Sequence, residues 1–251
     1  MTGQVPLGEG WDRHAHEWIA WSRTGFDTYD KFHRDAFLPL VPAPGRLTVD
    51  VGCGEGRVSR DLRAMGHRVL AIDRSLTMTR AAATHAACPV HAVVADATRL
   101  PLAAGAADCA VAFMSLHDID HMPDAIAEIA RVLAVGGRLV LAAVHPINSA
   151  GTFVGVKGDP DRPFVISGSY FTPVRYVESV AREGLTMTFH GEHRPLQAYT
   201  EALAEAGFVI ERLRESSDPD PGRAWQRIPL FVQIVAALQR PGGADPAPAG
   251  Y

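Results

Sequence analysis

Apolar runs and helical periods alternate along the middle of the chain. A β-branched run at residues 47–51 leads into glycines, and residues 58–65 then repeat apolar side chains at helical spacing up to Gly66. Strands that alternate with helices form a parallel sheet with right-handed crossovers and both faces covered. Residues 46–145 are therefore predicted to fold as a doubly wound α/β core. Further strands are predicted at 68–72, 90–95, 109–113 and 138–144, and further helices at 76–87 and 123–133.

The segments before and after this core follow different patterns. Residues 1–45 carry aromatic and aliphatic side chains at a roughly helical spacing that breaks near Gly25. We predict that they form an N-terminal cap of short helices. Residues 146–194 contain aromatic and β-branched islands between Gly, Pro and Ser residues. This pattern predicts a small antiparallel insertion that helps to enclose a substrate.

The last part of the chain is predicted to return to the core. Residues 195–240 contain one helical period, followed by two strand candidates that enclose a Ser-, Asp- and Pro-rich loop. The helix is predicted at 196–206 and the strands at 208–213 and 229–236. The tail at 241–251 is rich in Gly, Pro and Ala, and we expect it to be disordered because it buries little apolar surface.

Composition narrows the classes of function. The chain has 251 residues and a net charge of −4, and its Lys and Arg residues form no basic run, so a nucleic-acid substrate is not expected. Its three cysteines form no CxxC pair, which favours a reducing compartment and hence the cytoplasm. The N-terminus does not resemble a signal sequence, and no apolar run approaches the roughly 20 residues that span a bilayer. We therefore expect no membrane insertion.

A glycine-rich loop follows the first predicted strand of the core. Asp50 ends the strand, and Gly52, Gly54 and Gly56 follow in a GxGxG spacing. Glycines without a Cβ let a ligand approach the backbone closely, and the following helix N-terminus favours a carboxylate. The spacing differs from the GxGxxG of dinucleotide-binding proteins, and Asp50 would repel a pyrophosphate. An ammonium group would suit Asp50 better.

Two more aspartates follow the next predicted strands. Asp73 ends the second strand, where a carboxylate can accept hydrogen bonds from both hydroxyls of a ribose. Asp96 follows the third strand and can accept a hydrogen bond from the exocyclic amine of an adenine. Open α/β sheets bind their ligands at the carboxyl ends of the strands. The three aspartates therefore predict a single nucleoside-binding crevice.

The order of these motifs resembles that of the class I S-adenosylmethionine-dependent methyltransferases. The matching segments are Val49–Gly56, Ile72-Asp73, Ala95-Asp96-Ala97, Leu100-Pro101-Leu102 and Arg131–Leu139, so the resemblance covers about residues 46–145. It implies a seven-stranded sheet whose last strand is antiparallel. It also implies that S-adenosylmethionine is the cofactor and S-adenosylhomocysteine the product. The residues that would hold the cofactor are Asp50, Gly52, Cys53, Gly54, Gly56, Asp73, Arg74, Asp96, Ala97, Met114 and Ser115.

Methyl transfer from a sulfonium is an in-line displacement, in which the protein mainly positions the nucleophile and excludes water. A base is needed only if the nucleophile carries a proton at neutral pH. His117 and His145 follow the fourth and fifth strands and are the candidate bases. His145 has an equally plausible structural interpretation, in which its ring finishes the strand by a hydrogen bond to the backbone. The candidate substrate contacts are Trp18, Trp21, Tyr29, His145, Tyr170 and His190.

Other interpretations remain open. His117 and His121 have the i, i+4 spacing of metal ligands, but Pro123 indicates that the helix begins after them, so no metal is expected. The favoured function is methylation of a small metabolite or natural product, by a protein that is a monomer or homodimer. One alternative is a methyltransferase-like protein that binds the cofactor without methylating, as a cyclisation catalyst or binding module. A nicotinamide-dependent oxidoreductase is a further alternative, which the GxGxG spacing disfavours.

Overall fold

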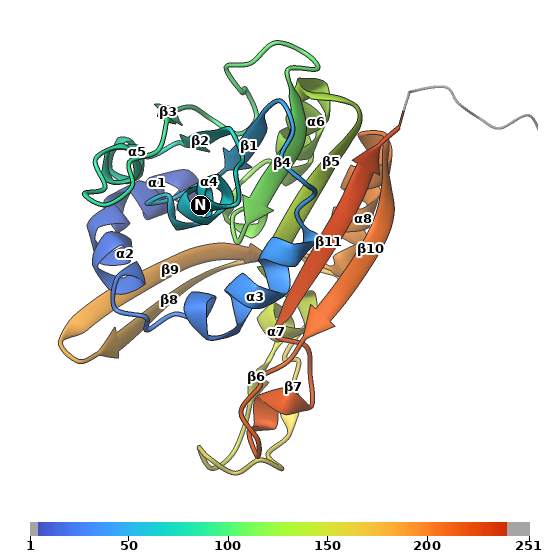
Figure 1. Ribbon diagram of the computed structural model, residues 1–251. Helices are drawn as coiled ribbons and strands as arrows, with labels where there is room; N and C mark the ends of the chain where they lie inside the picture. Colours follow the sequence, from blue (N-terminus) through green and yellow to red (C-terminus); the bar gives the residue numbers. More distant parts are fainter. Residues whose placement is uncertain (1–4, 240–251) are drawn as a thin grey trace, which may run out of the picture.

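The computed structural model describes residues 5–239. The predicted tail at 241–251 lies outside these residues. The centre of the fold is a seven-stranded sheet with strand order β10-β11-β5-β4-β1-β2-β3 (Figure 1). Its strands are β1 (Thr48–Val51), β2 (Val69–Asp73), β3 (Ala92–Val94), β4 (Ala107–Phe113), β5 (Leu133–Val144), β10 (Phe208–Ser216) and β11 (Phe231–Leu238).

The sheet confirms the doubly wound α/β prediction. Strands β1 to β5 pair in parallel, whereas β11 runs antiparallel to both of its neighbours, β5 and β10. This is the single antiparallel strand that the methyltransferase resemblance implied. In β4, successive side chains alternate between the two apolar cores, with Ala110 in one and Val111 in the other. Both faces of the sheet are therefore buried, as expected for parallel strands.

Helices cover the two faces separately. The core around Ile126 and Leu203 lies beneath α6 (Met122–Val132) and α8 (Leu196–Glu205). The core around Phe37 and Leu62 lies beneath α3 (Arg34–Phe37) and α4 (Arg57–Ala64). A further helix, α5 (Leu76–Ala83), packs beside β2 and β3. It ends before the predicted residue 87, at a C-cap on Thr84.

The N-terminal segment forms the predicted helical cap. It consists of two helices, α1 and α2, followed by a π-helical turn, α3 and a 3-10 turn. The bounds are α1 (Leu7–Arg13), α2 (Ala15–Ser22), η1 (Tyr29–His33) and η2 (Leu38–Leu40). Figure 1 shows α1 and α2 beside α5, over the ends of β1 and β2. The cap thus covers the edge where the glycine loop lies.

The insertion after β5 contains the predicted antiparallel strands. A long hairpin, β8 (Val174–Arg182) with β9 (Leu185–His193), extends under α2 and packs against it (Figure 1). A smaller lobe contains α7 (Pro146–Ala150), β6 (Thr152–Phe153) and β7 (Phe164–Val165), with the 3-10 turn η4 (Ala224–Gln226) beside it. No helix in the part of the chain from residue 5 to 239 is long and apolar enough to cross a membrane.

Candidate functional site

A cavity of about 800 Å³ lies at the carboxyl ends of β1, β2 and β4. Its walls come from the glycine loop, the cap, the 3-10 turn η3 (Leu116–Asp118) after β4, and the β8–β9 hairpin. The volume falls within the roughly 300–1,000 Å³ range of small-molecule sites. Chain segments that are distant in sequence therefore enclose one ligand-sized space.

The glycine loop forms the floor of this cavity. Gly52 has a φ of +71°, and a Cβ at this position would lie 2.4 Å from Cβ of Ser115. Ser115 in turn donates a hydrogen bond from its hydroxyl to the carbonyl of Val51 at 2.7 Å. The loop and the segment after β4 are thus packed so closely that no side chain fits between them. Gly54, with a φ of +55°, lies beside the indole of Trp18.

Gly56 has a structural role at the start of α4. Its φ of +86° starts α4, and a Cβ there would lie 2.8 Å from Cβ of Ala82 and 3.2 Å from Cγ2 of Val90. It is absent from the cavity lining. Its missing side chain allows α4 to pack against α5, and its contact with the cofactor stays a prediction.

Asp73 connects the second strand to the glycine loop. Its carboxylate accepts hydrogen bonds from the backbone N–H of Gly54 at 2.8 Å and of Ser75 at 2.9 Å. Burial raises the pKa of this carboxyl, although the backbone donors oppose the shift. Ser75 also donates its hydroxyl to Asp12 of α1 at 2.6 Å. The strand end, the loop and the cap therefore meet at this carboxylate.

Asp50 lies beneath the loop with 1% of its surface exposed, and the hydroxyl of Ser59 donates a hydrogen bond to it at 2.5 Å. Burial raises the pKa of Asp50 from 3.8 to about 7. A group whose pKa is higher in the folded than in the unfolded state contributes stability at low pH, which is lost as the pH rises through the folded value.

We expect the free energy of unfolding of the cofactor-free protein to fall between about pH 4 and pH 7 because Asp50 ionises in a buried place. Urea denaturation over this range measures the slope. Asp50→Asn keeps an acceptor for Ser59 but does not titrate, so its curve should be flatter. An unchanged slope in Asp50→Asn would assign the effect to other groups.

The remaining predicted cofactor residues lie around the same cavity. Asp96 accepts hydrogen bonds from the N–H and the hydroxyl of Thr98 at 2.9 and 2.7 Å. Burial raises the pKa of Asp96, but these hydrogen bonds outweigh burial and the pKa is lowered. Burial also raises the pKa of Cys53 well above its usual value, so this thiol is neutral and is not a nucleophile. Arg74, Ala97 and Met114 also line the cavity.

Aromatic side chains form the roof of the cavity. Phe189 of β9 makes edge contacts with three tryptophans of the cap, at centroid distances of 6.3 to 6.4 Å. These tryptophans are Trp11, Trp18 and Trp21, and all of them line the cavity. The indole N–H of Trp11 donates to the carbonyl of His190 at 2.8 Å. The roof thus joins the cap to the hairpin, and it contains the predicted residues Trp18 and Trp21.

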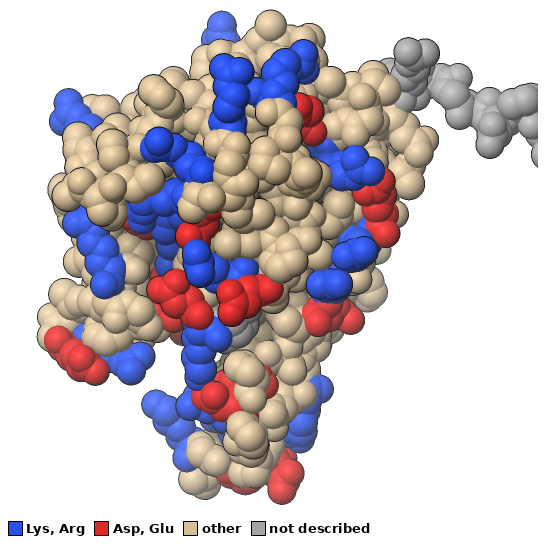
Figure 2. Space-filling view, in the orientation of Figure 1, with Lys and Arg blue, Asp and Glu red and all other residues tan. Residues whose placement is uncertain are grey.

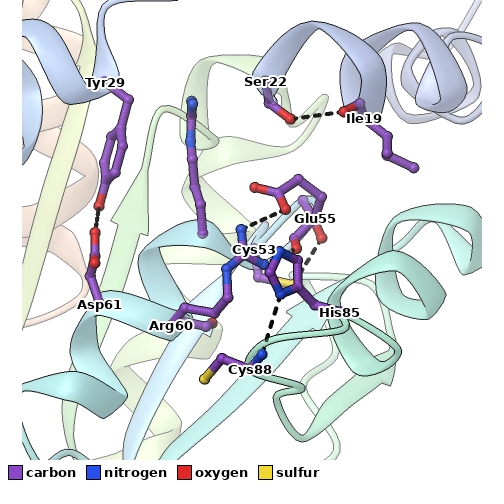
Figure 3. Close-up of polar contacts among 12 residues, drawn as sticks. Ile19, Ser22, Tyr29, Cys53, Glu55, Arg60, Asp61, His85 and Cys88 are labelled. Carbon is purple, nitrogen blue, oxygen red and sulfur yellow. Dashed lines mark hydrogen bonds and ion pairs between the residues drawn. The ribbon is translucent and has the colours of Figure 1, made fainter. Parts of the chain in front are cut away.

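Polar contacts anchor the roof to α4. Figure 3 shows the hydroxyl of Tyr29 donating to Asp61, at 2.7 Å, and Arg60 paired with Glu55 of the glycine loop at 2.7 Å. The guanidinium of Arg57 lies over the ring of Tyr29, 4.5 Å from its centroid. The predicted residue Tyr29 therefore lines the cavity while it is held in place by α4.

The structure separates the two candidate bases. His117 lines the cavity with 6% of its surface exposed, and burial lowers its pKa to about 3. His145 is absent from the lining. Its Nδ1 accepts the N–H of Ile147 at 3.0 Å and its Nε2 lies 2.8 Å from Glu215. We correct the assignment of His145 as base and substrate contact, because both of its ring nitrogens are engaged outside the cavity.

The two remaining predicted substrate contacts have different positions. His190 lines the cavity and its ring stacks on His14 of the cap, with centroids 4.9 Å apart. Tyr170 is not part of the lining. Its hydroxyl accepts the N–H of Leu196 at 3.0 Å, and its carbonyl accepts a hydrogen bond from His193. Tyr170 therefore connects the insertion to α8, and its assignment as a substrate contact is corrected.

Several lining residues were not predicted. They include Trp11, Asp118, Tyr176, Glu178 and Phe189. Trp11 shares the helical aromatic pattern of Trp18 and Trp21, and that pattern could have indicated it. The residues of β8 and β9 face the cavity only because the hairpin folds back under the cap, and the sequence contains no local signal for that contact.

The cavity fits S-adenosylmethionine. The bare backbone at Gly52 and Gly54 allows close approach of a ligand, and Asp73 and Asp96 lie at neighbouring strand ends. The fold is Rossmann-like, and the cavity lies where such folds bind their ligands. Residues 49–141 match the model of the methyltransferase domain family. This part of the chain is therefore similar to the S-adenosylmethionine-dependent methyltransferases, and the similarity implies S-adenosylmethionine as the cofactor.

Individual relatives and solved structures agree with this family. The chain is 33% identical over 117 residues to a demethylmenaquinone methyltransferase of Thermobifida fusca, which covers 45% of this chain and 50% of that protein. A crystal structure of an S-adenosylmethionine-dependent methyltransferase from Mesorhizobium loti superposes with a TM-score of 0.64 at 24% identity, over 81% of this chain and 96% of that one. The [4+2]-cyclase SpnF superposes with a TM-score of 0.61 at 19% identity, over 94% and 96%. The chain spans about half the length of the curated relatives it matches.

Proposed function

We propose that this protein transfers the methyl group of S-adenosylmethionine to a nitrogen or oxygen of a small molecule in the cytoplasm. One observation carries the proposal: the cofactor-type residues at Gly52 and Asp73 and the aromatic roof around Phe189 line the same cavity. A ligand on the glycine loop and a second small molecule under the roof would therefore be in contact. The three free cysteines support a reducing compartment.

The surface charge supports a small acceptor. Figure 2 shows acidic and basic side chains mixed on the visible face, without a broad basic surface. Nucleic-acid substrates are bound through clustered Lys and Arg residues. The enclosed, aromatic-rich cavity is instead typical of sites that bind a compact ligand with an apolar body.

Each part of the chain has a distinct task in this proposal. When bound, the cofactor supplies an electrophilic methyl group. The loop at Gly52 and Gly54 holds its amino-acid part, and Asp73 accepts hydrogen bonds from its ribose hydroxyls. The roof excludes water and orients the acceptor, which accounts for much of the acceleration in a displacement reaction. His117 is neutral at physiological pH because burial lowers its pKa to about 3, so its ring can accept a hydrogen bond from the acceptor.

Calorimetric titration with S-adenosylmethionine and S-adenosylhomocysteine tests the cofactor half of the proposal. Wild-type protein should bind both. Gly52→Ala should bind neither measurably, because its Cβ would collide with Ser115. Gly136→Ala is a matched control, since Gly136 also has a positive φ, +81°, but no atom within 4 Å of the added Cβ. Failure of the wild-type protein to bind either molecule would refute the proposal.

A second candidate function is cofactor binding without methyl transfer. The extensive superposition on the cyclase SpnF supports it, because that protein has this fold and is named for a cyclisation. The two functions differ in one measurement. With a bound acceptor, a methyltransferase releases S-adenosylhomocysteine in proportion to product, whereas a binding protein leaves S-adenosylmethionine intact.

A further inference from the structure

Two acidic side chains, Asp118 and Glu178, line the end of the cavity near the β8–β9 hairpin. The Lys and Arg side chains in the lining are Arg57 and Arg74, and neither forms an ion pair with these acids. Arg57 forms an ion pair with Asp27, and Arg74 packs against Gly8 of α1. Asp118 and Glu178, in contrast, line the cavity without a Lys or Arg ion-pair partner among residues 5–239.

Asp118 is placed deep in this region. Its side chain is 15% exposed, and its Oδ1 lies 3.4 Å from Nε2 of His117. The indole N–H of Trp11 also interacts with its carboxylate, so the roof and the acid are in contact. Burial raises the pKa of Asp118 well above its usual value, and the nearby Arg194 offsets this effect in part. A cation in the cavity would supply the missing opposite charge.

Glu178 and Tyr176 bring a second acid and a hydroxyl to the same region. Glu178 lies opposite Phe189 in the hairpin, and Tyr176 lies opposite Gly191. A Cβ at Gly191 would lie 2.3 Å from the hydroxyl oxygen of Tyr176, so the tyrosine ring packs over this glycine. Burial raises the pKa of Tyr176, and the charges of Asp118 and Glu178 raise it further, which indicates that both carboxylates lie near its hydroxyl.

An unsatisfied polar atom also points to a ligand here. Nδ1 of His117 is buried and has no hydrogen-bond partner among the described residues. A buried polar atom without a partner costs about 1–3 kcal/mol, so such atoms are usually satisfied by a ligand or by water. The acids, the aromatic faces of Trp11 and Phe189 and this nitrogen together form a site that suits a protonated amine with an apolar body.

We propose that the acceptor is a small, basic amine whose ammonium group binds beside Asp118 and beneath the Trp11–Phe189 roof. This inference rests on the proposed function. The nitrogen becomes nucleophilic once it gives one proton to a carboxylate oxygen of Asp118, which leaves a neutral amine beside a neutral carboxylic acid. The low-dielectric site favours this neutral pair over two charges. Acceptors that carry a carboxylate in place of the amine are excluded by repulsion from Asp118 and Glu178.

Three probes with the same phenylpropyl skeleton test the proposal. The protein is first saturated with S-adenosylhomocysteine and then titrated with 3-phenylpropylamine, 3-phenyl-1-propanol or 3-phenylpropanoate. We expect the amine to bind at least about tenfold more tightly than the alcohol, and the carboxylate to bind weakest. Equal binding of amine and alcohol, preference for the carboxylate, or no amine binding at millimolar concentration would each overturn the inference.

Asp118→Asn tests whether the carboxylate binds the ammonium group of the acceptor or the sulfonium of the cofactor. We expect the variant to bind the amine no better than the alcohol, while the affinity ratio of S-adenosylmethionine to S-adenosylhomocysteine stays unchanged. Asp124→Asn, an exposed change in the first turn of α6, is the matched control. If the cofactor ratio changes and the amine preference remains, Asp118 faces the sulfonium and the inference is wrong. Absence of S-adenosylhomocysteine binding in the wild type would instead refute the proposed function.

Discussion

Replacement of Asp73 by Asn should weaken S-adenosylmethionine binding by at least about 100-fold, because hydrogen bonds to a charged group contribute about 1.5–3 kcal/mol each. The carboxylate orders the glycine loop through the N–H of Gly54 and is proposed to hold the ribose as well. An Asn side chain offers one acceptor and places an amide N–H₂ against either Gly54 or Ser75. The loop and the ligand are both expected to lose a partner.

Calorimetry measures the affinity, and a melting curve confirms that the variant is folded. Asp35→Asn is the control, since Asp35 is an exposed residue of α3 that does not line the cavity. An affinity of Asp73→Asn within about threefold of wild type would mean that the ribose lies elsewhere. If the variant binds S-adenosylmethionine weakly but melts as the wild type does, the effect belongs to the site and not to the fold.

The sequence predicts the parts of this molecule that depend on local patterns. Alternating strands and helices gave the parallel sheet, and its antiparallel last strand followed from the family resemblance. Asp50, Asp73 and Asp96 line one cavity because each lies at or just beyond the carboxyl end of a parallel strand, and those ends share one edge of the sheet. Here a position in the sequence determines a position in space.

The two histidines illustrate what local patterns do not determine. His117 and His145 both follow a core strand closely, and the sequence gives no reason to separate them. The chain after His145 enters α7, where the ring caps the helix through the N–H of Ile147. The chain after Ser115 instead turns through η3 and folds back over the cavity. The direction of each turn depends on partners distant in sequence, Glu215 for His145 and Arg194 for η3.

The sequence predicted only part of the aromatic roof, because the rest depends on contacts between segments that are distant in sequence. The helical spacing of the cap indicated Trp18 and Trp21, but Phe189 lies in a hairpin whose own pattern only indicates strands. Its position against three tryptophans results from packing between the cap and the insertion. In the proposed function, substrate specificity would therefore depend on the segments that the sequence describes least well, and cofactor binding on those that it describes best.

Arg194 holds the turn that presents His117 and Asp118, and its loss should destabilise the protein strongly. Its guanidinium is 6% exposed and donates to the carbonyls of η3 and of the residues after it, with the shortest contact at 2.7 Å to Ile119. It also pairs with Glu192. Removal of one partner of a buried ion pair costs about 3–5 kcal/mol when the remaining charge is uncompensated, and Glu192 keeps only a longer contact, 3.8 Å, with Arg175. Arg194→Met should lower the free energy of unfolding by this amount, whereas Arg68→Met, at an exposed residue, should have little effect.

A double variant separates the two roles of Arg194, which are to neutralise Glu192 and to donate hydrogen bonds to the turn η3. In Arg194→Met the acid of Glu192 is left in a place where 17% of its side chain is exposed, so Glu192→Gln in the same chain should recover part of the lost stability. The carbonyls of Leu116 and Ile119 still lack their donor in the double variant. When it is saturated with S-adenosylhomocysteine, the double variant should therefore still bind the amine more weakly than the wild type does. Full recovery of both stability and binding would show that Arg194 only neutralises Glu192. Partial recovery of stability without recovery of binding is the expected result, because the turn at His117 and Asp118 needs the hydrogen bonds themselves.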